Sequence, residues 1–295
     1  PPRSTPKPSS AASDVYKRQI LDGKKLAEKS NDDLLARVEI LKQTGRPPKL
    51  VAILVGDDPA SATYVSMKEK ACEKLGIKTE IKRLSAETTT DQLENIISEL
   101  NADKEVDGIL LQHPVPSGID EQKCFNTIDI SKDVDGVTTQ GFGNMAMGLR
   151  AFGSCTPLGV MRLLEEYSVK IEGKNALVIG RSQILGKPMA AMLLNANATV
   201  TIAHSRTKDL VNMLKYFDIV VVAVGIPKFI SAKDLAPGSV LVDAGYHPME
   251  KCGDVDMTDI SNIVSAYTPV PGGVGPMTIN TLMMNTIEAM ELKNE

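Results

Sequence analysis

Short apolar runs alternate with amphipathic stretches along the first half of the chain. Residues 49–56 (KLVAILVG) form an apolar run that stops at a glycine, which is typical of a buried strand. Residues 62–76 are rich in helix formers and end at Gly76, a common helix stop. The pattern continues with a strand at 78–84, a helix from about Thr89 or Thr90, and a buried strand at 106–112. This half therefore predicts a βαβαβ arrangement.

The same alternation resumes after Cys155. A helix is predicted at 156–167, with Thr156 as its N-cap and Pro157 in its first turn. Apolar runs that end at a glycine or a polar residue follow at 175–180, 198–203, 218–225 and 239–245. A last helix is predicted at about 276–290, after the glycine-rich PGGVG, and it could return to either half. Alternating strands and helices predict an α/β protein of two domains, each with a mostly parallel sheet.

The length and hydrophobic content fit a protein with two hydrophobic cores, and the charge pattern narrows the kinds of partner to expect. A chain of 295 residues with 42% hydrophobic content can fill two domains of ordinary size. The net charge is −4 and no Lys/Arg run exceeds a pair, so we expect neither nucleic acid nor a membrane surface as partner. No apolar run approaches the ~20 residues that span a bilayer. These features predict a soluble, cytoplasmic protein.

The four cysteines lack the spacing of a metal site. Cys72, Cys124, Cys155 and Cys252 are scattered, without C-x-x-C pairs or clustered histidines. We therefore expect buried, reduced thiols, and neither a disulfide framework nor a bound metal.

Residues 1–19 are rich in Pro and Ser and show no hydrophobic periodicity. Such a segment is expected to be disordered and to lie outside the core. Its basic, acid-poor composition leaves a transit-peptide remnant as an alternative, which would place the protein in mitochondria, but the missing amphipathic pattern favours an artefact or a linker.

A nucleotide-binding unit is predicted at 175–207. A dinucleotide site needs a tight turn after a strand and a helix N-terminus that faces the pyrophosphate, and here Gly180 and Gly186 bracket such a turn. The spacing departs from G-x-G-x-x-G and is weak by itself. The second strand ends in Ser205 and Arg206 where an NAD site usually offers a carboxylate, so with Arg181 in the turn the pattern favours NADP. The alternative is that both arginines are solvated loop charges.

Polar side chains also mark the first half. Tyr64 and Lys68 fall on a helical stripe with Ala71, Cys72 and Leu75, so Lys68 sits where a core face is expected. Lys68 either extends along the helix edge to solvent or lines a cleft together with Tyr64 as an acid–base group. Gln112 ends a buried strand, at the sheet edge where open α/β sheets bind ligands. The KDVDG segment at 132–136 adds two acidic residues, which alone would indicate an ordinary turn.

Six ordered blocks together resemble the bifunctional methylenetetrahydrofolate dehydrogenase/cyclohydrolase family, from about residue 20 to 292. They are SATYVSMKEKACEKLGI, ILLQHPVP, KDVDG, CTPLGV, GRSQILGKPMA and TPVPGGVGPMT. The resemblance implies oxidation of 5,10-methylenetetrahydrofolate by NADP, hydrolysis of the methenyl product to 10-formyltetrahydrofolate, and a homodimer. It also implies a folate-binding catalytic domain at 20–153, a Rossmann-like NADP-binding domain at 154–275, a cleft between them, and a C-terminal helix at 276–295 packed on the first domain.

The resemblance also assigns roles to individual residues. Lys68 would be the principal catalytic group, Tyr64 would flank the pterin, and Gln112 would hydrogen-bond Lys68. Asp135 would anchor the donor edge of the pterin, which suits an acceptor-only carboxylate. The folate and nicotinamide side would include Pro271, Gly272, Gly273 and Thr278, with Gly275 in the same loop. The nucleotide side would comprise Gly180, Arg181, Ser182, Gly186, Ser205, Arg206 and Gly245.

Two departures from the family pattern are visible. His113 follows Gln112 where leucine is common; its imidazole could alter the lysine pocket, but alternation along a strand favours a ring that points away. Tyr246 and His247 occupy a loop where small polar residues are frequent. Two other interpretations stay open: a dehydrogenase that lacks the hydrolytic step or uses NAD, and a non-catalytic nucleotide-binding regulator, which should have lost some of the four catalytic-site residues.

Overall fold

The computed structural model describes residues 18–294. The prediction of a disordered tail therefore falls largely on residues outside the described part of the chain. Gln19 and Ile20 form a short strand, β1, so Gln19, which was predicted to lie in the disordered segment, is part of a sheet. β1 is stabilised by parallel pairing with β11 (Ala266–Tyr267), a contact with a segment far away in the sequence that local composition cannot indicate.

The first sheet has three parallel strands in the order β3-β2-β4. The strands are β2 (Lys49–Val55), β3 (Lys78–Leu84) and β4 (Gly108–Leu111). Its helices are α1 (Gly23–Thr44), α2 (Pro59–Leu75), α3 (Thr90–Ala102), α4 (Glu121–Thr127) and α5 (Thr139–Ala146). Alternate residues of β2 serve two different cores: Leu50 and Leu54 pack with α2, whereas Val51 and Ile53 pack with α3.

Local capping explains where α2 and α3 begin and end. The Asp58 carboxylate accepts a hydrogen bond from the Ser61 N–H at 2.7 Å, so α2 begins earlier than its predicted start at residue 62. Gly76 ends α2 in the left-handed conformation with φ 73°. Thr89 and Gln92 form a reciprocal capping box, which confirms the predicted start of α3.

The second sheet has six parallel strands in the order β1-β11-β9-β7-β5-β6. Besides β1 and β11, it contains β5 (Asn175–Ile179), β6 (Thr199–Ala203), β7 (Ile219–Val222) and β9 (Val240–Asp243). A separate two-stranded sheet pairs β8 (Ile230–Ser231) with β10 (Val255–Asp256). The associated helices are α6 (Cys155–Glu166), α7 (Gly186–Asn195), α8 (Leu210–Met213) and α9 (Ile260–Ile263), with 3-10 turns η1 (Leu214–Tyr216) and η2 (Ala232–Asp234).

The prediction of Thr156 as the N-cap of α6 is wrong. The helix begins at Cys155 and Ser154 is its N-cap, although Ser154 makes no side-chain capping bond. The Ser154 hydroxyl instead donates to the carbonyl of Gly136 at 2.6 Å, and the Thr156 hydroxyl lies 3.1 Å from that of Thr278. Both side chains are engaged in tertiary contacts, which outweigh the local preference.

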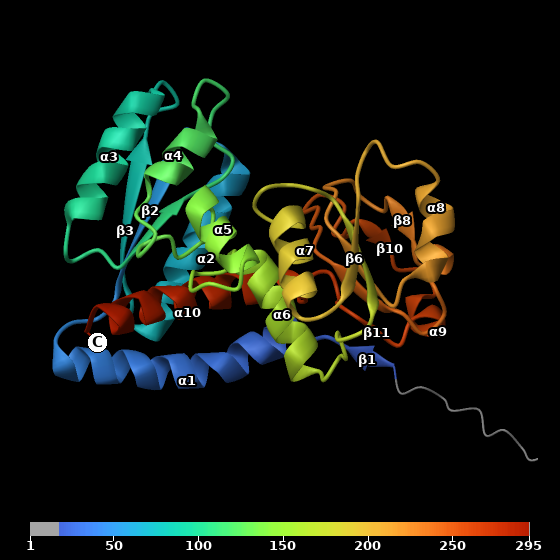
Figure 1. The fold of residues 1–295 in the computed structure, drawn as a ribbon. Helices are drawn as coiled ribbons and strands as arrows, with labels where there is room; N and C mark the ends of the chain where they lie inside the picture. Colours follow the sequence, from blue (N-terminus) through green and yellow to red (C-terminus); the bar gives the residue numbers. More distant parts are fainter. Residues whose placement is uncertain (1–17, 295) are drawn as a thin grey trace, which may run out of the picture.

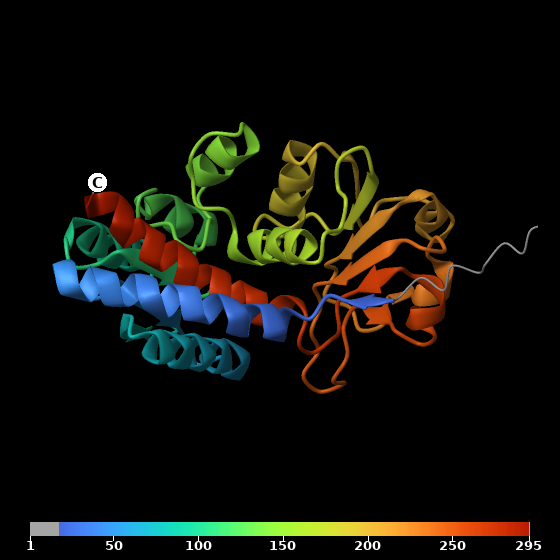
Figure 2. The ribbon, with the colours of Figure 1, turned by 90° about the horizontal axis from the view of Figure 1, so that it is seen from below.

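The last helix, α10 (Val274–Asn294), joins the two halves. It lies side by side with α1 in both views and packs on α6, which stands between the two sheets (Figures 1 and 2). Its first turns contribute Val274 and Met277 to the core of the six-stranded sheet. Further along, Met283 and Ile287 enter the core of the three-stranded sheet. One helix thereby fixes the carboxyl edges of both sheets relative to one another.

Within the described residues, no helix combines the length and apolar character needed to cross a bilayer. All four cysteines are free, and Cys72, Cys124 and Cys155 are buried, as predicted, whereas Cys252 is partly exposed. No group of at least three His, Cys, Asp or Glu side chains in the described part of the chain could hold a metal ion.

Candidate active site

A lysine and a glutamine from different elements meet at the carboxyl end of the three-stranded sheet. Lys68, on α2, donates from Nζ to Oε1 of Gln112 at 3.0 Å. Gln112 follows β4 and is only 8% exposed. Its Nε2 donates to the carbonyl of His113 at 2.7 Å, so the amide oxygen is held toward the ammonium group. A neutral amide can accept from lysine without fixing its charge, which leaves the amine able to take part in proton transfer.

Asp135 lies in the loop between α4 and α5. Both Asp135 and Lys68 influence the Cys155 thiol: burial raises its pKa, the Asp135 carboxylate raises it further, and the positive charge of Lys68 lowers it. Cys155 is therefore within electrostatic reach of both side chains. The backbone of Asp135 is fixed by a bond from the Cys155 N–H to its carbonyl at 3.2 Å.

Tyr64 lies one turn before Lys68 on α2 and is 38% exposed. Burial raises the pKa of its phenol, and Tyr246 raises it further. Tyr246 follows β9 of the other sheet, so a residue of the second unit lies within electrostatic reach of Tyr64. Partly exposed rings at such a place can flank a flat ligand.

His113 is oriented by α4. Its Nδ1 lies 2.7 Å from Oε1 of Glu121, which also accepts the N–H of Val115 at 3.1 Å. Since α4 packs on the face of the sheet opposite α2, the imidazole lies away from Lys68, as strand alternation predicts.

Two glycines shape the turn after β5. A Cβ on Gly180, whose φ is +125°, would lie 2.2 Å from the carbonyl oxygen of Ala223. A Cβ on Gly186 would lie 2.3 Å from the carbonyl oxygen of Gly180. Ser182 accepts the N–H of Gly186 on its hydroxyl at 3.2 Å and ties the turn to the start of α7. The N–H groups of Gly186 and Lys187 are both bonded to Ser182 and Pro188 has none, so α7 offers an anion the positive end of its dipole and not free N–H donors.

Basic and hydroxyl side chains surround this turn. Arg181, Ser182, Ser205 and Arg206 are all exposed. The N–H of Arg206 donates to Nδ1 of His204 at 3.1 Å, and the N–H of His204 donates to the Thr207 hydroxyl at 2.9 Å. These bonds fold residues 204–207 into a compact turn that begins where β6 ends. The guanidinium and hydroxyl donors of this group match the oxygens of a phosphate.

Sequence reasoning missed a buried carboxylate that joins two loops of the second sheet. Asp254 is fully buried, and its Oδ2 accepts the N–H groups of Val224 and Gly225 at 2.6 and 2.9 Å. Its Oδ1 lies 2.8 Å from Nε2 of His247. The loops after β7 and β9 are therefore held together at the edge where the nucleotide turn lies. The sequence gives no local sign of this role, because the strand after Asp254 is only Val255–Asp256 and its partners are the distant N–H groups of Val224 and Gly225.

Asp243, at the end of β9, is a second buried carboxylate of this network. It accepts the N–H groups of Gly245, Asp254 and Val255 at 2.9, 3.0 and 2.9 Å. Burial raises the pKa of Asp243 to about 6, and the charge of Asp254 adds to this although the three N–H donors oppose it. The N–H of Gly245 is thus already bonded to Asp243 and is not free for a ligand. What Gly245 can contribute to a cofactor site is its lack of a side chain.

The glycine-rich loop before α10 packs on the start of α1. The N–H of Lys24 donates to the carbonyl of Gly272 at 2.9 Å. A Cβ on Gly273 would lie 2.6 Å from the carbonyl oxygen of Pro269, so the tight course of the chain beside Pro271 requires glycine. The Thr278 hydroxyl lies near Thr156 of α6 and also donates to the carbonyl of Val274 at 3.3 Å. Thr278 therefore links α10 to α6.

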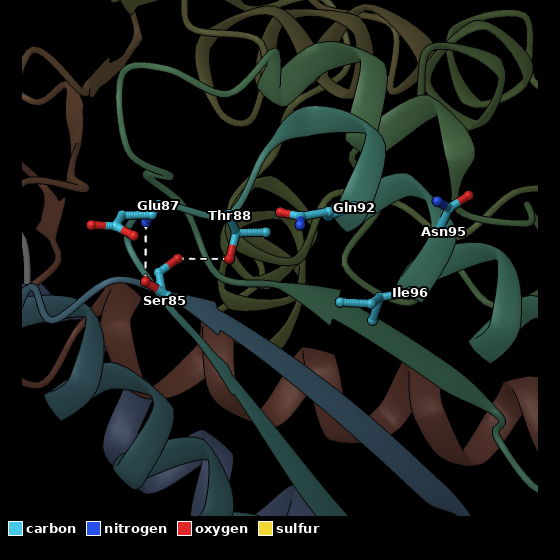
Figure 3. Close-up of a pocket in the computed structure, with 6 residues that line it drawn as sticks. All are labelled: Ser85, Glu87, Thr88, Gln92, Asn95 and Ile96. Carbon is cyan, nitrogen blue, oxygen red and sulfur yellow. Dashed lines mark hydrogen bonds between the residues drawn. The ribbon is translucent and has the colours of Figure 1, made fainter.

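A surface hollow lies elsewhere, beside the start of α3 (Figure 3). Its volume is about 530 Å³, and it is lined by Ser85, Glu87, Thr88, Gln92, Asn95 and Ile96. Among the residues drawn, Ser85 accepts from the Glu87 N–H on its hydroxyl and from the Thr88 hydroxyl on its carbonyl. Because α3 and α2 cover opposite faces of the sheet, this hollow is separate from Lys68 and Gln112.

Two parallel α/β units, one with a lysine–amide pair and the other with a phosphate-binding turn, define a nucleotide-dependent enzyme of two domains. The chain belongs to the tetrahydrofolate dehydrogenase/cyclohydrolase family: residues 21–135 match the model of its catalytic domain, and residues 154–294 match that of its NAD(P)-binding domain.

Known relatives cover nearly the whole chain. It is 60% identical over 275 residues to the bifunctional protein FolD of Teredinibacter turnerae, covering 93% of this chain and 98% of that protein. The crystal structure of the bifunctional enzyme FolD from Campylobacter jejuni matches with a TM-score of 0.91 and 43% identity over 93% of this chain and 99% of that one. The Trypanosoma brucei dehydrogenase-cyclohydrolase, solved with NADP cofactor and an inhibitor, matches with a TM-score of 0.89 and 32% identity over 94% and 99%.

Proposed function

We propose that the protein oxidises 5,10-methylenetetrahydrofolate with NADP and hydrolyses the 5,10-methenyl product to 10-formyltetrahydrofolate. The observation that carries this function is the 3.0 Å bond from Lys68 to the buried Gln112; both Lys68 and Asp135 also lie within electrostatic reach of Cys155. All four expected catalytic-site residues, including Tyr64, are present, which argues against a non-catalytic regulator. The bifunctional relatives at up to 60% identity support the same conclusion.

NADP fits the turn after β5. Gly180 and Gly186 leave the close backbone approach that a pyrophosphate needs, and the positive end of the α7 dipole would favour its charge. Arg181, Ser205 and Arg206 would hold the 2′-phosphate. When bound, the nicotinamide supplies the redox chemistry by accepting a hydride. The related Trypanosoma brucei enzyme, which was solved with bound NADP, supports this choice of cofactor.

In the dehydrogenase step the protein mainly positions the substrate. Asp135 would accept hydrogen bonds from the amino group and ring N–H of the pterin, and Tyr64 would flank the ring. These contacts hold the methylene carbon in a fixed place beside the glycine loop that includes Pro271, Gly272 and Gly273. Positioning of this kind lowers the barrier without acid–base help.

In the hydrolytic step water adds to the cationic methenyl carbon, one proton is released, and one carbon–nitrogen bond opens to leave the formyl group on N10. Lys68, directly or through a water, would carry the proton from the attacking water to the leaving nitrogen. Gln112 would hold the amine in place for both transfers, because its amide oxygen is fixed toward Nζ.

Purified protein tests this function with 5,10-methylenetetrahydrofolate and either NADP or NAD, with methenyl formation and decay followed separately. We expect Lys68→Met to lower the rate of methenyl decay by at least ~100-fold, a typical acid–base contribution, with NADP affinity unchanged. Lys70→Met, one exposed lysine further along α2, is the matched control. Undiminished decay in Lys68→Met would remove the proposed role of Lys68, and methenyl formation with NAD alone would make the protein an NAD-dependent relative.

The domain organisation and the oligomeric state are further parts of the proposal. A folate-binding unit at 20–153, an NADP-binding unit at 154–275 and the helix at 276–295 would form one subunit of a homodimer. Support for a dimer comes from β6, an edge strand of the six-stranded sheet, where Ile202 is 42% exposed, and from Leu194 of α7, which is 60% exposed. A cytoplasmic location, or a mitochondrial one if residues 1–19 are a transit remnant, stays a prediction.

A further inference from the structure

The segment that carries Asp135 is held by an unusually complete set of hydrogen bonds from distant residues. Asn285, on α10, is 1% exposed and donates from Nδ2 to the carbonyl of Val134 at 2.8 Å. The same nitrogen reaches the carbonyl of Gly153 at 3.3 Å. One buried amide thus bridges the chain just before Asp135 and the chain just before α6.

The next two carbonyls are held from the same side. The carbonyl of Asp135 accepts the Cys155 N–H at 3.2 Å, and that of Gly136 accepts the Ser154 hydroxyl at 2.6 Å. Gly136 has φ +67°, and a Cβ there would lie 2.4 Å from the backbone nitrogen of Ser154. Three consecutive carbonyls, at 134, 135 and 136, are therefore bonded to a cradle made of residues 153–155 and Asn285.

The side chain of Asp133, just before this segment, is also hydrogen-bonded within the protein. The Asp133 carboxylate, 1% exposed, accepts the N–H groups of Val137 and Thr138 at 3.0 and 2.9 Å. Asp135 is the half-buried acid of the segment, and like Lys68 it lies within electrostatic reach of Cys155. The surrounding bonds fix the backbone from which its carboxylate projects, so the direction of that carboxylate depends on them.

We propose that Asn285, together with Ser154, is a positioning residue that sets the Asp135 carboxylate for the pterin. This inference rests on the proposed role of Asp135 in folate binding. Loss of the Asn285 amide leaves the Val134 carbonyl with the weak Cys155 thiol donor at 3.3 Å, and a buried acceptor that is poorly satisfied moves or takes in water. A shift of the Asp135 backbone would weaken folate binding while the NADP turn, on the other sheet, stays as it is.

Asn280 provides a matched control on the same helix. It is 4% exposed, and its Nδ2 donates to Oδ1 of Asn31 at 2.9 Å and toward the carbonyl of Ala27 at 3.3 Å, both on α1. Asn280→Ala therefore removes an equally buried amide from α10 without touching the cradle. A general loosening of the helix should affect both variants alike.

The experiment compares Asn285→Ala, Asn280→Ala and Asp135→Asn by kcat, by KM for 5,10-methylenetetrahydrofolate, by Kd for NADP and by urea midpoint. Asn285→Ala should raise the folate KM about tenfold relative to Asn280→Ala, with NADP Kd within about twofold of the unmodified protein. Equal folate KM values in the two asparagine variants overturn the inference if Asp135→Asn raises KM. An unchanged KM in Asp135→Asn instead overturns the role of Asp135 in the proposed function, and the inference with it.

If Asn285→Ala does not fold, Ser154→Ala tests the same inference. It removes only the bond to the Gly136 carbonyl and creates little space. A rise in folate KM of about threefold or more, at unchanged NADP Kd, supports the cradle. A folate KM equal to that of the unmodified protein in this variant overturns it.

Discussion

At the scale of single residues, we expect Arg181 to decide more about the cofactor than the glycines beside it. The glycines give any dinucleotide room to approach, whereas a guanidinium distinguishes the charged 2′-phosphate from a neutral 2′-hydroxyl. Arg181→Ala should weaken NADP binding about 10- to 100-fold, the value of one charged hydrogen-bonding contact, and change NAD binding far less. Titration of each nucleotide against protein fluorescence or by calorimetry gives both Kd values.

Arg150→Ala is the control for that comparison, because Arg150 is an exposed arginine in the loop between α5 and α6, outside the turn after β5 and the turn after β6. It should leave both Kd values unchanged. Equal losses of NADP and NAD affinity in Arg181→Ala would contradict the assignment of Arg181 to the 2′-phosphate.

Asp243 gives a pH prediction whose sign follows from burial. The pKa of Asp243 is raised from 3.8 to about 6, so between about pH 4 and pH 6 the folded protein binds a proton that the unfolded chain has lost. The contribution of Asp243 to the free energy of unfolding is therefore full below about pH 4 and falls as pH rises to about 6, by up to ~3 kcal/mol. Above that range it is constant.

Urea unfolding of the unmodified protein and of Asp243→Asn between pH 4 and pH 7 measures this contribution. Asparagine cannot titrate, so the stability advantage of the unmodified protein over the variant should shrink as pH rises toward 6. An advantage that stays constant or grows over this range would show that the three N–H donors to Asp243 outweigh its burial.

At the scale of helices and strands, local rules located most elements and failed where a distant contact decided the outcome. The βαβαβ order, the Thr89 start of α3 and the Gly76 end of α2 all follow from periodicity and capping chemistry. Gln19 joins a strand only because β11 is next to it. The N-cap of α6 moved to Ser154 because tertiary hydrogen bonds, and not its own helix, occupy the Ser154 and Thr156 hydroxyls.

The contact between α6 and α10 depends on a missing side chain. A Cβ on Gly159 of α6 would lie 3.1 Å from the backbone and side chain of Met277 on α10. Gly159→Leu should therefore force the helices apart at a cost of about 1–3 kcal/mol, of which ~1 kcal/mol is offset by helix propensity, so the free energy of unfolding should fall by up to about 2 kcal/mol. Chemical denaturation measures the change.

Gly143→Leu is the matched control on α5, since a Cβ there meets nothing within 4 Å. Without crowding, only the gain in helix propensity remains, so its stability should be equal to or above that of the unmodified protein. If both leucine variants are equally stable, close packing of α6 on α10 is not what requires glycine at 159.

At the scale of the whole molecule, the sequence identified individual site residues better than it identified their partners. Lys68 and Gln112 stood out because each is a polar group at an apolar place, and the family resemblance paired them. Asn285 and Asp254 carry no such local sign: each acts by bonding backbone groups more than twenty residues away. Such contacts depend on how the two sheets and α10 pack, which the spacing of residue types does not encode.

The edge of the six-stranded sheet gives the last prediction, on assembly. Among the described strands β6 pairs only with β5, so its other edge is open. Ile202 on β6 exposes 42% of its surface, and Leu194 on the adjacent helix α7 exposes 60%. If this edge is the proposed dimer interface, Ile202→Lys puts a charge in an apolar contact, a change that edge strands use to prevent pairing. Sedimentation velocity at micromolar concentration should then show a single 31.7 kDa chain for the variant and twice that mass for the unmodified protein.

Met249→Lys is the control, because Met249 is 91% exposed in the loop after β9, and this variant should stay dimeric. A dimeric Ile202→Lys protein would show that the interface lies on another face.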